Sequence, residues 1–239
     1  MGETTTWPET GARIIFLKVE GLEAGHSLSP SEAAAYAAFR IEKRRKEWLA
    51  GRLAAKFLLA ETDGIYPCAA ERAAGIYPRA AGTKSPDAYE IGHDAFGRPS
   101  CGGRLLSISH SNGWALAALK PGENSFLGAD LEITEPRHPA WYRDYFNKSE
   151  LPEPEPSAAT RIWTIKEALM KALGLGLMAD PLDIRTGGKI QFSGRVLERY
   201  KELGSPEFSV EARATPEGFW TAVAAGKRTG PIEIPLQKN

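Results

Sequence analysis

The stretch GADLEI, residues 128–133, places two acidic residues in an otherwise apolar hexapeptide. If its apolar residues face a core, Asp130 and Glu132 share the opposite face of a strand, because side chains alternate along it. Like charges so close repel each other unless a cation neutralises them. Mg²⁺ is the natural candidate, since it binds carboxylates and fills its octahedral shell with water and phosphates. A solvent-exposed strand face is the alternative interpretation.

A third acid stands at helical spacing in WTIKEALMK, residues 163–171. Trp163, Glu167 and Lys171 lie at i, i+4 and i+8 and therefore share one side of a helix. The plain alternative is a surface ion pair between Glu167 and Lys171, worth ~0.3 to 0.5 kcal/mol. Together with the two strand acids, however, Glu167 completes an oxygen site for a divalent cation. That site narrows the chemistry to phosphoryl or diphosphate transfer.

Two further segments offer contacts to a phosphate. SISHS supplies Ser109 and His110 at the end of a strand, and imidazole donates to phosphate in its neutral or its charged form. FGRP supplies Gly97, where backbone approaches a ligand closely, and Arg98, whose guanidinium suits phosphate. A structural histidine and an ordinary loop turn are the respective alternatives.

The elements that must position these residues begin with a strand and two helices. RIIFLKVE, residues 13–20, is rich in branched and aromatic side chains and predicts the strand. Ser29, Pro30 and Glu32 match the cap, first position and acid of a capping box. From there to Ala60, alanines and long side chains predict two consecutive helices.

The second of these helices is predicted to have an apolar and a basic side. Its apolar positions at helical spacing are Trp48, Leu49, Leu53 and Phe57. Its basic positions are Arg45, Arg52 and Lys56. Such a basic side is either solvated or available to an anion.

The rest of the chain predicts further strands and one functional helix. Asn-Gly between two alternating runs is a strong hairpin signal, and PEPEPS, residues 152–157, is typical of a stiff connector. The expected segments are a loop with short strands over 62–103, a hairpin of 104–111 and 114–120, a strand over 126–133, a helix from 157 to about 174, and paired strands over 208–214 and 219–226.

WTAVAA near the end of the chain resembles WALAAL after the first hairpin turn, and this suggests an internal repeat. We therefore expect an α+β protein made of two similar αβ halves, residues 1–122 and 123–239. A ligand cleft is expected between the halves.

Composition excludes several classes of protein. The 239 residues are 42% apolar, and 30 basic residues balance 30 acidic ones, so net charge favours neither a nucleic-acid nor a membrane partner. Cys68 and Cys101 are too few for a disulfide framework. No apolar run reaches the ~18 residues that suggest a membrane span. We expect a cytoplasmic protein.

In chain order, GRP, SISHS, GADLE, YFNKSE and WTIKEALMKALGLGL resemble the motifs of the 4′-phosphopantetheinyl transferases. The resemblance is to the larger, pseudo-dimeric group that includes the enzyme activating surfactin synthetase, and it covers roughly residues 29–185. LAGR, residues 49–52, also looks like the amino-terminal half of that family. The resemblance implies transfer of the phosphopantetheine arm of coenzyme A to a serine of an apo acyl or peptidyl carrier protein, with release of adenosine 3′,5′-bisphosphate.

The resemblance also implies residue roles. Asp130, Glu132 and Glu167 match the acids that hold Mg²⁺ or Mn²⁺, and Glu167 matches the proposed base. Lys171 and His110 are expected to stabilise the charge that develops on the phosphate. The expected coenzyme A contacts are Arg45, Arg52, Gly97, Arg98, Pro99, Ser109, His110, Lys166 and Lys171.

Fused halves suggest a monomer that docks an acidic, helical carrier near the cleft mouth. Two alternatives stand beside this hypothesis. One is another Mg²⁺-dependent enzyme that cleaves a diphosphate. The other is a non-catalytic protein that binds coenzyme A or a carrier.

Overall fold

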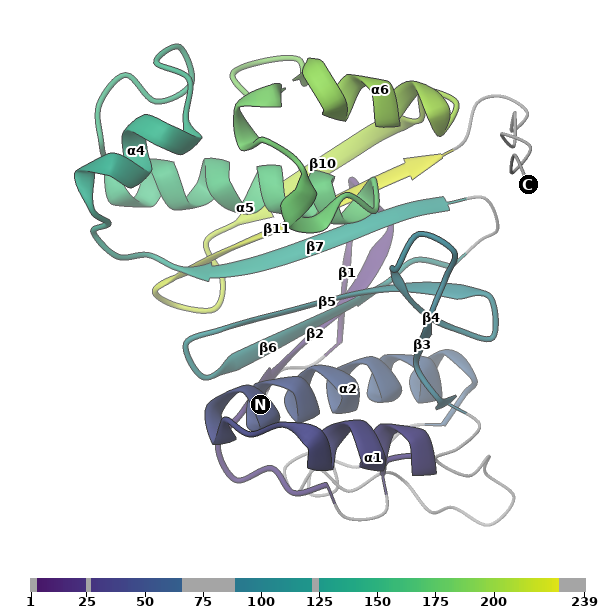
Figure 1. Ribbon diagram of the computed structural model, residues 1–239. Coiled ribbons are helices and arrows are strands. Elements are labelled where there is room, and N and C mark those ends of the chain that lie inside the picture. The colour runs from purple at the N-terminus through teal and green to yellow at the C-terminus, as the bar shows by residue number, and fades with distance from the viewer. Residues whose placement is uncertain (1–3, 25–26, 66–88, 122–124, 228–239) are drawn as a thin grey trace.

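Two β-sheets face each other, and a long helix covers the outer face of each (Figure 1). The computed structural model describes residues 4–24, 27–65, 89–121 and 125–227. Cys68 lies outside these residues, whereas Cys101 is buried. Helices and strands are mixed, as predicted. Within the described residues, no helix is long and apolar enough to cross a membrane.

The first half forms a six-stranded sheet in the order β1-β2-β6-β5-β4-β3 with two helices on one face. Its elements are β1 (Thr5–Trp7), β2 (Ala12–Lys18), α1 (Pro30–Ala38), α2 (Glu42–Thr62), β3 (Gly92–His93), β4 (Pro99–Cys101), β5 (Arg104–Ser111) and β6 (Trp114–Leu119). The predicted capping box is confirmed: the hydroxyl of Ser29 accepts from the Glu32 amide, and the Glu32 carboxylate accepts from the Ser29 amide.

The hairpin of β5 and β6 turns at Asn112 and Gly113, as the Asn-Gly pair predicted. Both residues have positive φ, 41° and 82°, the backbone conformation that a type I′ hairpin turn requires. Asparagine tolerates this region and glycine enters it without steric cost. The end of β5, with its serines and histidine, is thereby fixed in register against β6.

The second half forms a three-stranded sheet in the order β10-β11-β7 and a separate two-stranded ribbon. Its elements are β7 (Ser125–Ile133), α4 (Pro139–Tyr145), α5 (Pro156–Ala172), the 3₁₀ helices Gly176–Met178 and Pro181–Asp183, β8 (Ile184–Arg185), β9 (Gln191–Phe192), α6 (Gly194–Glu202), β10 (Glu207–Arg213) and β11 (Phe219–Lys227). The predicted connector ends inside α5, because Glu155 caps the helix by accepting from the Ser157 amide.

Both halves share one topology. In the series β2–α2–β5–β6, strand β6 lies between β2 and β5 and pairs with both. In the series β7–α5–β10–β11, strand β11 lies in the same way between β7 and β10. An apolar cluster from both sheets joins the halves; its central members include Ile14, Leu116, Leu131 and Val223. The six-stranded sheet ends at Leu119 and the three-stranded sheet begins at Ser125, while the division into domains near residue 122 stays a prediction.

The WALAAL and WTAVAA echo is nevertheless out of structural register. Trp114 packs against the cluster between the sheets, whereas Trp220 lies on the α5 side, where its Nε1 donates to the hydroxyl of Ser157 at 2.8 Å. A shift of one residue sends every side chain of a strand to the opposite face. The alignment that preserves the faces is ALAALK, 115–120, with AVAAGK, 222–227.

Gly128 lets α5 lie directly on β7. A Cβ at this position would stand 1.9 Å from the carbonyl oxygen of Ala168 and 2.6 Å from the amide nitrogen of Ala172. No side chain fits there without moving the helix backbone. The first residue of the GADLE motif therefore sets the distance between the acidic strand and the helix that carries Glu167 and Lys171.

We predict that Gly128→Ala lowers the free energy of unfolding by about 3 kcal/mol, because the added methyl group must displace helix backbone. Urea denaturation measures the change. Gly92→Ala is the matched control, since a Cβ there meets nothing within 4 Å, and its effect is expected within about 0.5 kcal/mol. Equal stability of the two variants would contradict this account of the packing.

Candidate active site at the junction of the two sheets

Serine hydroxyls of β5 form hydrogen bonds with backbone groups at the edge of β7. Among the described residues, β7 has a hydrogen-bonded partner strand only on its other side. The hydroxyl of Ser107 accepts from the Ala129 amide at 2.8 Å, and that of Ser111 accepts from the Ile133 amide at 3.4 Å. An unpaired strand edge that is buried would otherwise leave polar backbone unsatisfied. Sequence reasoning singled out only Ser109 of this group; the spacing of serines every second residue in SISHS was the available signal.

Asp130 is the buried centre of the junction. It is 3% exposed, and its Oδ1 accepts from the hydroxyl of Ser109 and from Lys171 Nζ, both at 2.7 Å. Lys171 Nζ also donates to the carbonyl oxygen of Ala129 at 3.1 Å. The second oxygen, Asp130 Oδ2, is buried and has no hydrogen-bond partner. A buried carboxylate oxygen without a partner is costly, so it marks a position suited to a cation.

Glu132 and Glu167 both respond to the charge of Asp130. Burial and then the nearby Asp130 raise the pKa of Glu132 to about 7, although Ser111 and Arg137 contact its carboxylate at 3.1 and 3.4 Å. Burial and then Asp130 also raise the pKa of Glu167 above its ordinary value. Mutual repulsion of this kind is relieved by a shared dication.

The three acids thus fit a hard divalent cation in charge and donor type, with Asp130 Oδ2 as the oxygen left over for it. Across the residues that the structure describes, however, no three acidic, histidine or cysteine side chains stand close enough together to enclose a metal ion. Glu132 and Glu167 interact with Asp130 electrostatically, since its charge contributes to the raised pKa of each. The metal triad stays a prediction.

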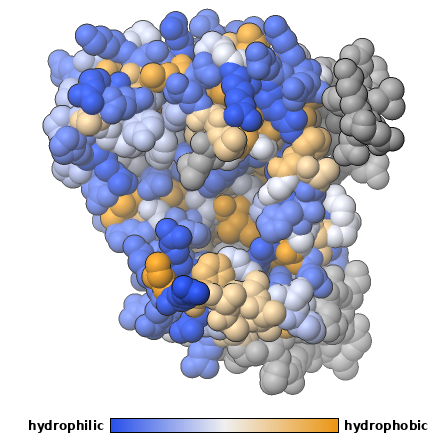
Figure 2. Space-filling view, viewed as in Figure 1, coloured by the Kyte–Doolittle hydropathy of each residue, from blue (hydrophilic) through white to orange (hydrophobic). Residues whose placement is uncertain are grey.

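A pocket of about 260 Å³ opens beside this junction, where the surface is hollowed between the two halves (Figure 2). The predicted Gly97, Arg98 and Pro99 line it from the first half and Lys171 lines it from α5. The other lining residues are Phe96, Leu106, Ser107, Ile108, Leu127, Gly174, Leu175 and Gly176. The structure therefore brings two motifs that are distant in the sequence to one cleft.

Arg98 connects the two walls of this cleft through contacts with Asp94 and with the end of α5. Its guanidinium pairs with Asp94 at 2.7 Å and donates to the carbonyl oxygen of Ala172, near the end of α5, at 3.2 Å. Gly174 follows with φ 68°, and a Cβ there would stand 3.0 Å from Cβ of Phe96. Because Asp94 already neutralises the guanidinium, a phosphate at Arg98 has to compete with that carboxylate.

His110 is not among the residues that line this pocket, and 45% of its side chain is exposed. Burial lowers its pKa, an effect that Glu47 opposes and Lys171 reinforces. Lys171 connects β5, the strand of His110, to Asp130, because its Nζ also donates to the hydroxyl of Ser109 at 3.0 Å. Of the predicted phosphate contacts, Ser109, His110 and Lys171 are thus grouped in space.

The basic residues Arg52 and Lys56 of α2 are buried inside the first half. Arg52 is buried, donates to the carbonyl oxygen of Ile91 at 2.8 Å and stacks on Trp48, while Lys56 is fully buried and pairs with Glu32 at 2.6 Å. Of the two interpretations of the basic side of α2, solvation does not hold for Arg52 and Lys56, because α1 and the segment around Ile91 cover them.

Arg45 and Arg52 do not line the pocket beside Lys171. Arg45 lies over the ring of Tyr36, 5.5 Å from its centre, and its Nε is buried without a hydrogen-bond partner. Their expected contact with coenzyme A stays a prediction.

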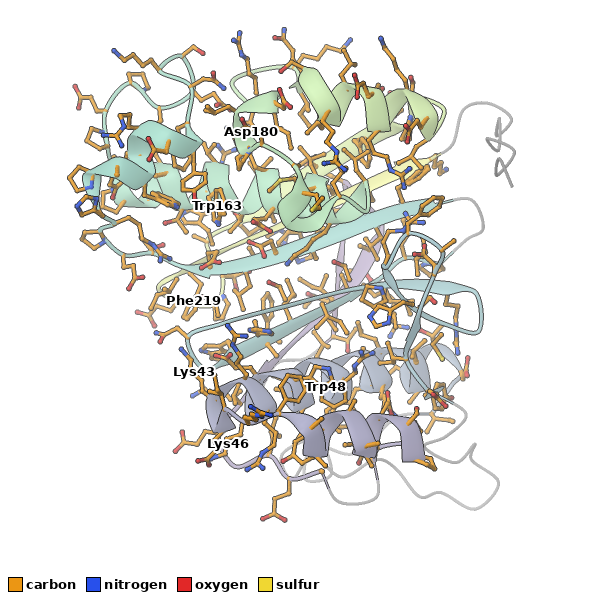
Figure 3. All side chains as sticks on the ribbon, in the orientation of Figure 1. Lys43, Lys46, Trp48, Trp163, Asp180 and Phe219 are labelled. Carbon is orange, nitrogen blue, oxygen red and sulfur yellow. The ribbon has the colours of Figure 1, made fainter. Side chains whose placement is uncertain are left out.

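Lys166 forms internal contacts that stabilise the fold, whereas a contact with coenzyme A was expected for it. Its side chain is fully buried, and Nζ donates to Glu150 and to the carbonyl oxygens of Tyr145 and Pro181 at 2.9 to 3.0 Å. An ammonium has three donors, so none is left for coenzyme A. Trp163, which Figure 3 labels, lies on the face of α5 that bears Glu167. Its ring packs on that of Trp141, with the ring centroids 5.7 Å apart.

We predict that Lys166→Met lowers the free energy of unfolding by about 3 to 5 kcal/mol, because it leaves the buried Glu150 carboxylate without its cation. Urea denaturation measures the loss. Lys148→Met makes the same change at an exposed position nearby and is expected to cost little. A Lys166→Met protein as stable as Lys148→Met would contradict the structural role.

We also predict that Mg²⁺ raises the free energy of unfolding, by about 2.7 kcal/mol at a concentration 100 times the dissociation constant. Asp130→Asn is expected to abolish the increase, whereas Asp144→Asn, at an exposed position, keeps it. Each variant is unfolded in urea with and without the metal. An equal increase in Asp130→Asn would argue against these acids as ligands.

Comparisons with known proteins bear on this site. The model of the 4′-phosphopantetheinyl transferase superfamily matches residues 126–215, which include β7 and α5. The chain is similar to holo-[acyl-carrier-protein] synthase from Thermotoga maritima over 43% of its own length and 63% of that protein's, with 18% identity and a TM-score of 0.34. It thus spans less than two thirds of that synthase. No curated protein sequence matches. Residues 126–215, which carry Asp130, Glu132, Glu167 and Lys171, are thus similar to the 4′-phosphopantetheinyl transferase superfamily.

Proposed function

We propose that this protein transfers the 4′-phosphopantetheine arm of coenzyme A to a serine of an apo acyl or peptidyl carrier protein. The observation that carries the proposal is the junction at which Lys171 and Asp130 meet beside a cleft between the halves. The match of residues 126–215 to the superfamily model and the repeated β–α–β–β topology support it. We further propose that the chain is of the larger, pseudo-dimeric type and acts as a monomer in the cytoplasm.

In this proposal the carrier serine attacks the β-phosphorus of coenzyme A, and the bond to the bridging oxygen breaks. Adenosine 3′,5′-bisphosphate leaves with the bridging oxygen. Glu167 takes the proton of the serine, directly or through water, as the general base. Lys171 exchanges one of its three present acceptors for a phosphate oxygen on which charge develops. Unlike the fully buried Lys166, its side chain is 26% exposed and lines the cleft.

A divalent cation, Mg²⁺ or Mn²⁺, held by Asp130, Glu132 and Glu167 would neutralise charge on the diphosphate of coenzyme A. Ser109 and Lys171 keep Asp130 in place by occupying its Oδ1, which leaves Oδ2 to the metal.

The remaining predicted contacts bind the nucleotide end of coenzyme A. We assign Gly97, Arg98 and Pro99 to the cleft wall, with Arg98 shared between Asp94 and the ligand. His110 contacts a phosphate from β5. Arg45 and Arg52 are proposed as further basic contacts from the first half.

Mass spectrometry of apo carrier proteins incubated with coenzyme A and Mg²⁺ tests the proposal. A carrier is expected to gain the mass of the phosphopantetheine arm. Glu167→Gln is expected to slow transfer by about 10² to 10⁴, the usual contribution of a general base. Asp130→Ala is expected to abolish it, while Glu217→Gln, on an exposed turn, retains the native rate.

Unchanged masses across a panel of acyl and peptidyl carriers would overturn the proposed function. Binding of coenzyme A without transfer would then favour a non-catalytic binding protein.

A further inference from the structure

A buried acid on α2 faces the histidine of the site. Glu47 is 7% exposed, and its Oε2 lies 3.5 Å from Nδ1 of His110. Its other oxygen, Oε1, lies 3.9 Å from Nζ of Lys43, a side chain 75% exposed near the start of α2 (Figure 3). A buried carboxylate is costly unless it is paired, and His110 is the nearer of these two partners.

The packing of α2 on β5 makes this contact. A Cβ at Gly51 would stand 2.6 Å from Cγ2 of Ile108, so helix and strand are in close contact there. Four residues along a helix cover about 6 Å, and two residues along a strand cover about 6.6 Å. Glu47, one turn before Gly51, therefore meets His110, two residues after Ile108.

Three elements present charge to His110. Glu47 comes from α2, Asp130 from β7 and Lys171 from α5. Burial lowers the pKa of His110, Glu47 raises it as the largest opposing charge, and Lys171 lowers it. Glu47 thus supports the protonated ring against burial and against the neighbouring ammonium.

We propose that Glu47 is a positioning residue that orients His110, and this inference rests on the proposed function. Nδ1–H of the ring points to Glu47 Oε2, which leaves Nε2 as the nitrogen that donates to a phosphate oxygen of coenzyme A. The carboxylate also favours the protonated ring and so opposes the burial that lowers the pKa of His110. Glu47 itself touches no reacting atom.

NMR titration of His110 tests the orientation without requiring turnover. In Glu47→Gln the titration midpoint of His110 is expected to shift to lower pH, because the charge that stabilises the imidazolium is gone. Glu42→Gln is the matched control: it removes the same charge from the same helix, but Glu42 pairs with Lys46 at 2.7 Å. His110→Asn assigns the signal. An unchanged midpoint in Glu47→Gln, or an equal shift in Glu42→Gln, overturns the inference.

Kinetics provide the second readout. Glu47→Gln is expected to lower kcat/KM for coenzyme A roughly tenfold, equivalent to about 1.4 kcal/mol, and to move the decline of kcat/KM at high pH to lower pH. Glu47→Asp, which keeps the charge, is expected to restore part of the loss. In the His110→Asn background, Glu47→Gln is expected to have no further effect.

A full additional loss in the double variant would overturn the positioning role. Absence of any carrier modification by the native protein would instead refute the proposed function, while the NMR result still decides whether Glu47 orients His110.

Discussion

The contact between Lys171 and Asp130 is the interaction on which the candidate site depends. It joins α5 to β7, and through Ser109 it also ties β5 of the first half to the second half. The ammonium satisfies one carboxylate oxygen and leaves the other buried and unpartnered. This arrangement stabilises the junction and, at the same time, keeps a negative charge available for a cation.

Close backbone packing determines whether these groups meet. Gly128 brings α5 onto β7, and Gly51 brings α2 onto β5. Lys171 and Asp130 meet at the first of these contacts, and Glu47 and His110 at the second. A larger residue would have to displace helix backbone at Gly128 and the Ile108 side chain at Gly51, whereas an ion pair between buried groups depends on distances of about 3 Å. The site is therefore as much a product of these two glycines as of its charged residues.

The repeated topology also explains why only one half carries the acids. Trp48, Arg52 and Lys56 follow the same spacing on α2 as the corresponding tryptophan, acid and lysine on α5. In the face-preserving register, Leu17 of β2 stands where β7 has Asp130, since these residues pair with Ala115 and Ala222. With a leucine and an arginine at two acid positions, the first half offers no oxygen site at that place. Its buried Lys56 is neutralised instead by Glu32 of α1.

Local signals in the sequence determined the capping box at Ser29, the Asn-Gly hairpin and the alternation that places Asp130 and Glu132 on one face, because neighbouring residues decide each of them. Tertiary structure alone decided the register of the repeat, the burial of Arg52 and Lys56, and the different partners of Lys166 and Lys171 on α5. Lys166 and Lys171 look equivalent in the sequence, yet one is enclosed by Glu150 and two carbonyl groups and the other reaches Asp130. The physical reason is that a charge takes its role from the partners that enclose it, and here those partners come from segments distant along the chain.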